Sequence, residues 1–299
     1  MLLNWLKAAA DETRLRLLVI CSQGEFTVSE LTFILGQSQP RVSRHLKRLC
    51  DAGLLQRNKE QTWVFYGVSV QAQAKQFLSA CLHLHQFDQA QGELALFEQD
   101  QRQVAQVIAT RDAKAQRILQ ELTQQNRILD LSDDQERSLG QHIKAAIEKH
   151  ELGVLLDIGT GSGRMLRLLG SCAKQAVGVD ISPDMLALAR AQVRAEGLDH
   201  CLLRHGDMYH LPYPDATFNT ITFDTVLPEA NYPDQAIAEA RRLLAPKGLI
   251  IVVELSHELP SNRPAELAQT LDRLAFSQLH FSSFSLGSVS VALVIGMKA

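Results

Sequence analysis

The stretch Val154-Leu-Leu-Asp157-Ile-Gly159-Thr-Gly161-Ser-Gly163 decides how the second half of this 299-residue chain is interpreted. A short apolar run ends near an acid and passes into a turn with three glycines before a helical pattern begins. Glycines at such a turn let the backbone approach a ligand, and the N-terminus of the next helix favours a carboxylate or phosphate. The stretch therefore predicts the first strand, turn and helix of an open α/β sheet that binds a ligand.

Further apolar runs follow, and helical segments separate the earlier ones. This alternation predicts a parallel sheet covered on both faces. Asp180 ends the next strand and could accept hydrogen bonds from both hydroxyls of a ribose, while Asp207 ends the third and could accept from an adenine amino group. Turn glycines in a generic doubly wound sheet are the alternative, but acids at successive strand ends favour a ligand site. The last two runs meet at Gly287 without a helix, which predicts an antiparallel pair at one edge.

Four segments, DIGTGSGRML, VGVDISPDMLALAR, GDMYHLPYPDATF and EARRLLAPKGLIIVVE, carry a family resemblance. From about 133 to 299 the chain resembles class I S-adenosylmethionine (SAM)-dependent methyltransferases, and within them the UbiE-like group that acts on small molecules. The resemblance implies a doubly wound, Rossmann-like sheet of seven strands with the last strand antiparallel, and SAM or S-adenosylhomocysteine (SAH) as cofactor. The positions that match the family's cofactor motifs are Asp157, Gly159, Thr160, Gly161, Gly163, Asp180, Ile181, Met185, Asp207 and Met208.

No catalytic residue follows from this sequence. Relatives usually carry a histidine-containing run after the fourth strand, where this chain has Asp224-Thr-Val-Leu-Pro-Glu229. The Asn/Asp-Pro-Pro-Tyr loop of base-methylating enzymes and a cysteine cluster suited to arsenic methylation are also missing. Glu229 is either a base or a solvated loop acid. Methyl transfer from a sulfonium needs little acid–base help once the nucleophile is positioned. The missing motifs therefore do not exclude methyltransferase activity.

The first 70 residues predict short helices followed by a β-hairpin. Val28–Leu35 forms a helix that Gly36 closes, and Ser38 should cap a second helix. The apolar face of this second helix is Val42, Leu46 and Leu49, at helical spacing. Two short helices of this kind, with polar residues outward on the second, predict a helix-turn-helix whose second helix enters a DNA major groove.

Charge supports nucleic-acid contact at this end. The formal net charge of −3 conceals a split, because residues 1–72 carry nine Lys/Arg against six Asp/Glu. The hairpin tip Arg57-Asn-Lys59 would act as a wing on the DNA backbone. The residues expected at DNA are Ser38, Gln39, Arg41, Ser43, Arg44, His45, Lys47, Arg57 and Lys59. A solvated helix face without DNA contact is the alternative.

Four segments near the N-terminus carry a second family resemblance: DETRLRLL, GEFTVSEL, LGQSQPRVSRHLKRLCDAGLLQR and TWVFYGV. On these segments, residues 5–85 resemble the ArsR/SmtB winged-helix repressors. The resemblance implies a homodimer that pairs through the first and last helices, here 2–10 and 71–86. Arsenic sensors carry Cys-Val-Cys where this chain has Thr27-Val-Ser29. Zinc-sensing relatives carry their ligands on the last helix, where this chain has only Cys81, His83 and His85. The two histidines point to different helix faces. We therefore expect no metal site.

The remaining sequence features indicate the cellular compartment and the division of the chain into domains. Five scattered cysteines without a CxxC predict reduced thiols in the cytoplasm, and no apolar run approaches the roughly 20 residues of a membrane span. The glutamine-rich stretch between Gly92 and Gly140 contains neither Pro nor Gly, which predicts helix. We predict an α/β protein with a winged helix-turn-helix domain at 1–86, a helical connector at 87–132 and a methyltransferase-like domain at 133–299. The connector could instead be a dedicated binding module.

The sequence favours a transcriptional regulator that binds operator DNA as a homodimer and uses SAM or SAH as its effector. This architecture resembles ArsR-methyltransferase fusions, including SAH-responsive repressors. One alternative is an active small-molecule methyltransferase whose winged helix regulates its own operon. Another is a winged helix that serves only for dimerisation.

Overall fold

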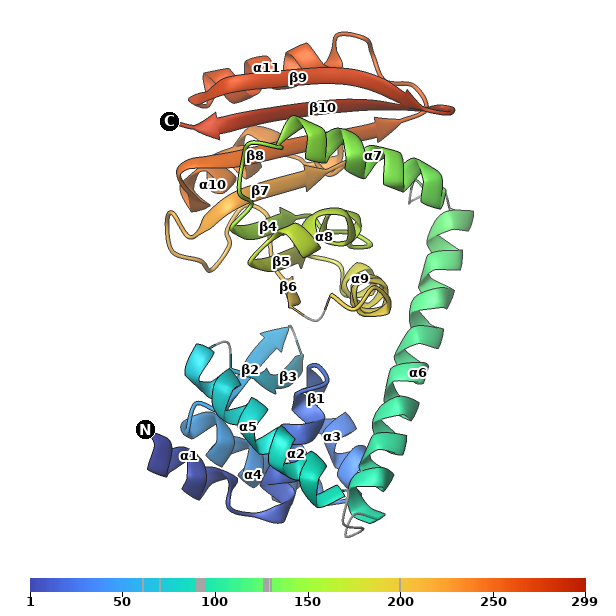
Figure 1. Cartoon of the computed structure of the whole chain (residues 1–299). Coiled ribbons are helices and arrows are strands. Elements are labelled where there is room, and N and C mark those ends of the chain that lie inside the picture. Colours follow the sequence, from blue (N-terminus) through green and yellow to red (C-terminus); the bar gives the residue numbers. More distant parts are fainter. Residues whose placement is uncertain (61, 70, 90–94, 126–128, 130, 199) are drawn as a thin grey trace. The chain divides into compact units, whose positions relative to one another are not determined.

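The computed structural model describes residues 1–299 except 61, 70, 90–94, 126–128, 130 and 199 (Figure 1). It divides into two compact units, Met1–Arg111 and Asp112–Ala299. The division falls inside one continuous helix, α6 (Ala95–Gln124). Each unit is described by itself.

The first unit is a helical domain with a three-stranded sheet of order β1-β3-β2. Its elements are α1 (Leu2–Ala9), α2 (Glu12–Cys21), β1 (Phe26–Thr27), α3 (Val28–Leu35), α4 (Gln39–Asp51), β2 (Leu55–Glu60), β3 (Trp63–Val68), α5 (Ala72–Gln89) and the first part of α6. Side chains from α2, α3, α4 and β1 form the core, and Val104 and Val107 of α6 join it.

The predicted helix-turn-helix is confirmed as α3 and α4. Thr27 and Glu30 make reciprocal hydrogen bonds that start α3, and Gly36 ends it with φ 62°, a backbone conformation that favours glycine. Val42, Leu46 and Leu49 are fully buried, as their spacing predicts. Ser38 occupies the N-cap position of α4, but its hydroxyl makes no capping hydrogen bond. The buried stripe therefore fixes which face of α4 is left for solvent or DNA.

Two buried or half-buried arginines fasten α6 to this unit. Arg16 Nε lies 2.6 Å from Asp100 Oδ2, and Arg16 Nη2 lies 2.7 Å from Asp100 Oδ1. Arg111 donates to both carboxylate oxygens of Glu30, at 2.8 and 2.6 Å. The helix that the absence of Pro and Gly predicts is thus present as α6, and ion pairs tie it to α2 and α3.

The second unit carries a seven-stranded sheet of order β6-β5-β4-β7-β8-β10-β9. Its further elements are α7 (Asp133–Ala146), β4 (Val154–Ile158), α8 (Arg164–Leu169), a 3-10 turn (Gly170–Cys172), β5 (Gln175–Asp180), α9 (Pro183–Ala195), β6 (Cys201–His205), β7 (Phe218–Asp224), a 3-10 turn (Leu227–Glu229), α10 (Pro233–Leu243), β8 (Leu244–Ser256), α11 (Arg263–Arg273), β9 (Phe276–Leu286) and β10 (Val289–Lys298).

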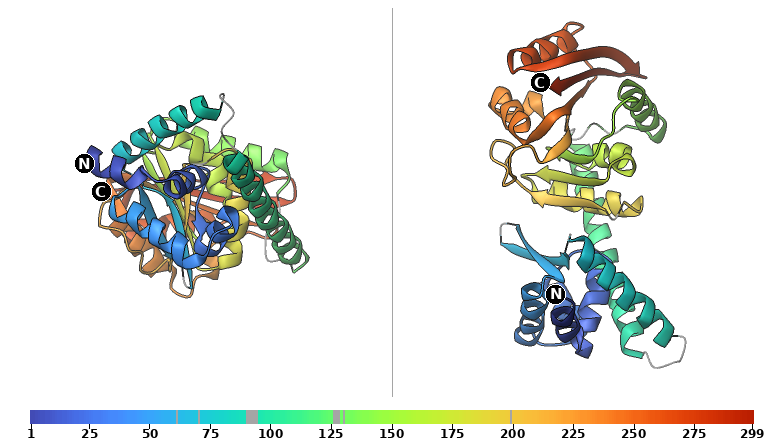
Figure 2. Two further views of the ribbon diagram at one scale, coloured as in Figure 1. Left: turned by 90° about the horizontal axis from the view of Figure 1, so that it is seen from below. Right: turned by 60° about the vertical axis from the view of Figure 1, so that its left-hand side comes forward.

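The predicted α/β class and the antiparallel edge pair are both confirmed. Strands β4 to β8 pair in parallel, whereas β10 is antiparallel to both β8 and β9. Apolar side chains of α7, α8 and α9 bury one face of the sheet, and those of α10 and α11 bury the other. The right-hand view in Figure 2 shows α7 on one side of the sheet and α10 and α11 on the other. Loops at the carboxyl ends of the parallel strands are therefore left to carry a site.

Candidate functional site

Most of the residues expected at DNA lie exposed on α4 and β2. Arg41, Arg44 and Lys47 project from α4 on the side away from its buried stripe. Ser38, Gln39, Arg57 and Lys59 are also exposed, and Ser43 is half-buried. The exposed residues leave basic side chains along the N-terminal part of α4, where a helix-turn-helix meets base edges and phosphates.

His45 differs from these residues because it turns toward α2. Its Nδ1 lies 3.4 Å from a carboxylate oxygen of Asp11, and its side chain is 14% exposed. Burial lowers the pKa of His45, the nearby cations Arg14, Arg41 and Arg48 lower it further, and Asp11 opposes them. His45 therefore packs between α4 and α2, and the sequence pattern does not separate it from its exposed neighbours.

The hairpin also differs in detail from the sequence expectation. Arg57 and Lys59 lie inside strand β2, paired with Tyr66 and Val64 of β3, and so are not the tip of the hairpin. Strand β2 ends at Glu60 and β3 begins at Trp63, which is 56% exposed. The predicted position of the tip is wrong because Arg57 and Lys59 belong to an alternating strand pattern, in which charged residues occupy one exposed face.

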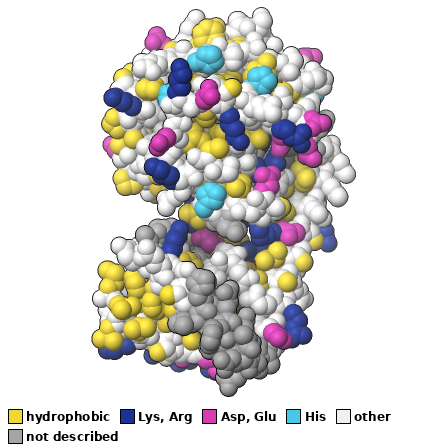
Figure 3. All heavy atoms as spheres, viewed as in Figure 1, with side chains coloured by type: hydrophobic (Ala, Val, Ile, Leu, Met, Phe, Trp, Pro, Cys, Tyr) yellow, Lys and Arg dark blue, Asp and Glu magenta, His cyan; other side chains and the backbone are white. Residues whose placement is uncertain are grey.

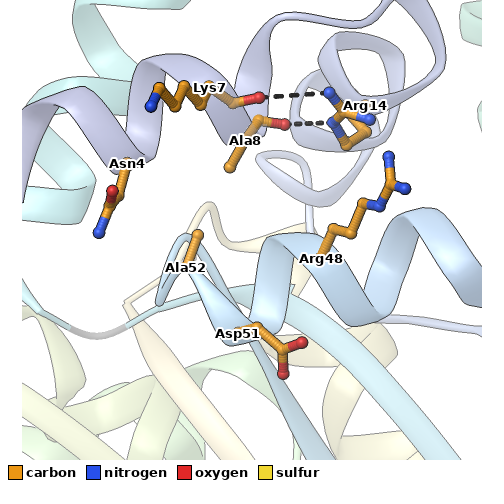
Figure 4. Close-up of a pocket in the computed structure, with 7 residues that line it drawn as sticks. All are labelled: Asn4, Lys7, Ala8, Arg14, Arg48, Asp51 and Ala52. Carbon is orange, nitrogen blue, oxygen red and sulfur yellow. Dashed lines mark hydrogen bonds between the residues drawn. The ribbon is translucent and has the colours of Figure 1, made fainter.

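A shallow hollow of about 340 Å³ lies between α1 and the C-terminal part of α4. Figure 4 shows its lining residues, Asn4, Lys7, Ala8, Arg14, Arg48, Asp51 and Ala52. The buried Arg14 guanidinium donates to the carbonyls of Lys7, Ala8 and Ala10 and so ends α1. The hollow lies away from the N-terminal part of α4, and its one buried cation is already satisfied.

In the second unit, Asp157 organises the start of the glycine turn. It is completely buried, and its two oxygens accept hydrogen bonds from the hydroxyls of Thr160 and Thr222, each at 2.6 Å. Burial raises the pKa of Asp157 to about 7, although the two hydroxyls oppose the shift. Asp157 and Thr160 therefore stabilise the glycine turn through a buried hydrogen bond.

This pKa predicts a pH-dependent stability for the second unit. A raised folded-state pKa means that the stabilising contribution is complete below the ordinary carboxyl pKa and is lost as pH rises toward about 7. Denaturant unfolding followed by circular dichroism at pH 5 and pH 7.5 should show the wild type losing more stability than Asp157→Asn, by about 1 kcal/mol or more. Equal pH dependence in the two proteins would contradict the assignment.

The three glycines of the turn have different surroundings. A Cβ on Gly159 would lie 2.5 Å from Val226 Cγ2, and one on Gly163 would lie 3.3 Å from Ala189 of α9. A Cβ on Gly161 would meet only the carbonyl oxygen of Gly159, at 3.9 Å. Gly159 and Gly163 therefore allow close packing against their neighbours. Gly161 instead leaves open space beside the backbone, which we call the glycine cradle.

Asp180 brings the end of β5 to the same turn. One of its oxygens accepts from Gly161 N at 2.9 Å and the other from Ser182 N at 2.8 Å. Ile181, the next residue, is 61% exposed although it is large and apolar. Met185 is half-buried in the first turn of α9. An open glycine, a strand-end carboxylate and an exposed apolar side chain fit the ribose and the flat base of a nucleoside.

Asp207 and Met208 follow β6, as expected. Asp207 is exposed and accepts a hydrogen bond from Tyr209 N at 3.0 Å, and Met208 packs partly against the core. The structure thus places the three predicted acids at the ends of, or just after, the neighbouring strands β4, β5 and β6.

Sequence reasoning missed the other side of the turn. Arg164 directly follows Gly163, and Asp224 ends β7, the neighbour of β4 opposite β5. Arg164 Nη1 lies 3.3 Å from Asp224 Oδ2. A basic residue straight after the glycine turn and an acid ending an apolar strand were the available signals. Their pairing required the strand order, which the sequence alone does not show.

Two further features of the described residues bear on the site. No group of three His, Cys, Asp or Glu side chains among them is arranged to hold a metal ion. Cys81 is half-buried, while the side chains of His83 and His85 lie outside the described part of the chain. Within that part, no helix combines the length and apolarity that crossing a bilayer requires.

Comparison with known proteins finds a different family model matching part of each unit. Residues 11–57 match the model of the bacterial regulatory protein arsR family, and residues 156–252 match that of the methyltransferase domain. The arsenical resistance operon repressor of Escherichia coli is 47% identical over 64 residues, which are 21% of this chain and 55% of the repressor. Demethylmenaquinone methyltransferase of Thermus thermophilus is 34% identical over 131 residues, which are 43% of this chain and 58% of the enzyme. The chain thus spans little more than half the length of either relative.

Among solved structures, a SAM-dependent methyltransferase from Aquifex aeolicus matches 57% of this chain and all of its own length, with 17% identity and a TM-score of 0.45. The two sequence matches follow one another along the chain, in the order in which the helix-turn-helix and the seven-stranded sheet occur. The chain therefore joins an N-terminal segment that matches the arsR-family regulator model to a C-terminal segment that matches the methyltransferase-domain model.

Proposed function

We propose that this protein is a transcriptional regulator whose methyltransferase domain binds SAM or SAH as an effector, in the cytoplasm. The observation that carries the proposal is the joining of an exposed, basic recognition helix to a second unit with an open glycine cradle at Gly161. Two sites on one chain, coupled by about 1–3 kcal/mol, suffice for regulation.

The cofactor would be held by the residues already described. Asp180 would accept from the ribose hydroxyls, Ile181 and Met208 would contact the adenine, and Gly161 would allow close approach of the backbone. When bound, SAM supplies an activated methyl group on its sulfonium sulfur. Asp157 has both oxygens occupied and supports the turn from behind.

Homodimerisation through α1 and α5 is part of the proposal. Leu2, Leu3 and Leu6 are 60%, 62% and 50% exposed on α1, whereas Trp5 points inward and is 6% exposed. Figure 3 shows hydrophobic side chains gathered over this end of the first unit. An exposed apolar patch on a regulator domain fits a protein interface, and a dimer would read two half-sites of an operator.

An active methyltransferase is the second candidate, and one observation favours it. Tyr209 and Tyr232 pack edge to face with ring centroids 6.0 Å apart, in the loops that follow β6 and β7. Tyr232 is 59% exposed and could form one wall of an acceptor pocket. Glu229 lies in the same loop, but no described contact directs it toward a substrate.

One set of binding measurements separates the two candidates. An operator selected from random duplex DNA should bind with an affinity that changes by at least about fivefold when SAM or SAH is added, the lower end of ordinary coupling. Unchanged DNA affinity together with methyl transfer to any small acceptor would refute the sensor and support the enzyme.

Replacing Arg44 by Ala should weaken operator binding by about 1–3 kcal/mol, because an arginine on this helix contacts a guanine edge or a phosphate. Arg102→Ala is the matched control, since Arg102 is an exposed arginine of the same unit on α6. Fluorescence anisotropy gives the affinities and light scattering gives the mass. Equal affinities for Arg44→Ala and wild type would argue that the winged helix serves dimerisation alone.

A further inference from the structure

Two consecutive residues of α6, Arg111 and Asp112, make ion pairs in different units of the chain. The boundary between the units falls between these two residues, inside one helix of 30 residues. Arg111 pairs with Glu30 of α3 in the first unit. Asp112 pairs with Arg194 of α9 in the second unit. No Pro or Gly interrupts α6, and sharp kinks arise mostly at such residues, so both ion pairs have one stiff support.

Arg111 holds the carboxylate that starts the first helix of the helix-turn-helix. Its guanidinium donates to both oxygens of Glu30, at 2.8 and 2.6 Å, and to the carbonyl of Glu25 at 3.0 Å. The same Glu30 carboxylate accepts from Thr27 N at 2.7 Å and so caps α3. The guanidinium carbon also lies 5.1 Å from the centre of the Phe26 ring. A displacement of Arg111 therefore acts directly on the start of α3.

The proposed ligand site has a comparable connection to the start of α9. Asp180 accepts from Ser182 N at 2.8 Å, and the hydroxyl of Ser182 caps α9 by accepting from Met185 N at 3.3 Å. A ribose that binds Asp180 uses the same carboxylate that holds this cap. The ligand and α9 therefore share one acceptor, so binding changes the hydrogen bonds at the start of the helix.

Helix α9 also packs directly on the glycine turn. A Cβ on Gly163 would lie 3.3 Å from Ala189 and 3.4 Å from Val193, which leaves no room for a side chain between turn and helix. Closely packed elements of this kind transmit a displacement to each other. Val193 is followed by Arg194, whose guanidinium donates to Asp112 of α6. A change at the turn or at the start of α9 therefore reaches α6 through Arg194.

A second contact joins α6 to α9 but is weaker. Lys114 Nζ lies 3.9 Å from Asp184 Oδ1, and the two side chains are 66% and 64% exposed. Long, exposed ion pairs contribute little. The side chains of Asp112 and Arg194 are 42% and 27% exposed. The Asp112–Arg194 pair is therefore the better candidate for the link between α6 and α9.

We propose that the Glu30–Arg111 and Asp112–Arg194 pairs couple occupancy of the ligand site to the start of the helix-turn-helix. The inference rests on the proposed function and names the residues through which the effector acts. A fivefold change in operator affinity corresponds to about 1 kcal/mol, which partly exposed ion pairs can supply. The alternative is that the two pairs only fasten α6 to each unit.

The test measures the coupling between the two sites in the full chain. Fluorescence anisotropy gives operator affinity with and without saturating SAM or SAH, and the ratio of the two affinities is the coupling factor. Wild type should give a factor of at least about fivefold. Asp112→Arg places like charges at the link, so it should reduce the factor below about twofold. Operator affinity without ligand, and ligand affinity without DNA, should stay close to the wild-type values.

Reversing the pair tests whether the charges themselves carry the coupling. Adding Arg194→Asp to Asp112→Arg restores opposite charges and should restore the coupling factor. Glu121→Gln is the matched control, because Glu121 is an exposed acid of the same helix, and it should leave the factor unchanged. Calorimetry provides an independent readout, since operator DNA must change ligand affinity by the same factor.

The outcomes separate this inference from the proposed function. If wild type binds neither SAM nor SAH, or if both leave operator affinity unchanged, the proposed function fails and this inference fails with it. If wild type is coupled and Asp112→Arg keeps the full factor, the inference alone is overturned. A factor that falls and is not restored by the reversed pair overturns it as well. Should Asp112→Arg not fold, Asp112→Asn removes only the charge and should still lower the factor.

Discussion

Replacing Asp100 by Asn should destabilise the first unit by about 3–5 kcal/mol. Asp100 is 1% exposed and Arg16 is 5% exposed, and they meet through two hydrogen bonds of 2.6 and 2.7 Å. The neutral amide leaves the guanidinium buried without its counter-charge, which is the expensive way to break such a pair. Tryptophan fluorescence during urea unfolding measures the effect selectively, because both tryptophans, Trp5 and Trp63, belong to this unit.

Two variants make this expectation specific to the pair. Glu98→Gln removes an exposed carboxylate from the first turn of α6, and it should change stability by less than about 1 kcal/mol. The double variant Arg16→Met, Asp100→Leu should recover most of the loss, since apolar side chains of similar size can replace a buried ion pair. If Asp100→Asn is as stable as wild type, the ion pair between Arg16 and Asp100 does not hold α6 on the domain.

Structural features that depend on neighbouring residues in the chain are the ones that the sequence pattern predicts. Helical spacing correctly predicts the buried stripe of Val42, Leu46 and Leu49. The glycine after the helix is also confirmed, because Gly36 ends α3 in the left-handed conformation. The glycine turn and Asp180 also meet as predicted, because neighbouring parallel strands end at one edge. These inferences need only periodicity, turn chemistry and the direction of the chain.

Contacts between distant segments were not accessible in the same way. Asp100 and Arg16 are 84 residues apart, and Arg164 and Asp224 are 60 apart. Each pair depends on which elements become neighbours, and no local pattern determines that. His45 shows the same limit on a smaller scale, since its turn toward Asp11 depends on how α2 packs against α4.

The second large effect concerns two glycines of one turn that look alike in the sequence. Gly159 has φ 69° and Gly161 has φ 52°, so an alanine at either position adds a left-handed strain of about 1–2 kcal/mol. Only at Gly159 would the new methyl clash with a neighbour, Val226, at 2.5 Å. Gly159→Ala should therefore lose about 2–5 kcal/mol of stability, because overpacking adds about 1–3 kcal/mol to the strain.

Gly161→Ala should behave differently, because its methyl enters the open cradle where the nucleoside is proposed to lie. We expect only the backbone strain to appear in unfolding measured by circular dichroism, while SAH affinity in calorimetry falls at least tenfold. Gly159→Ala is the control for nonspecific loss of the turn, since it should lower stability more than Gly161→Ala does. If Gly161→Ala binds SAH as wild type does, the ligand does not approach this backbone, and the open side of the turn needs another explanation.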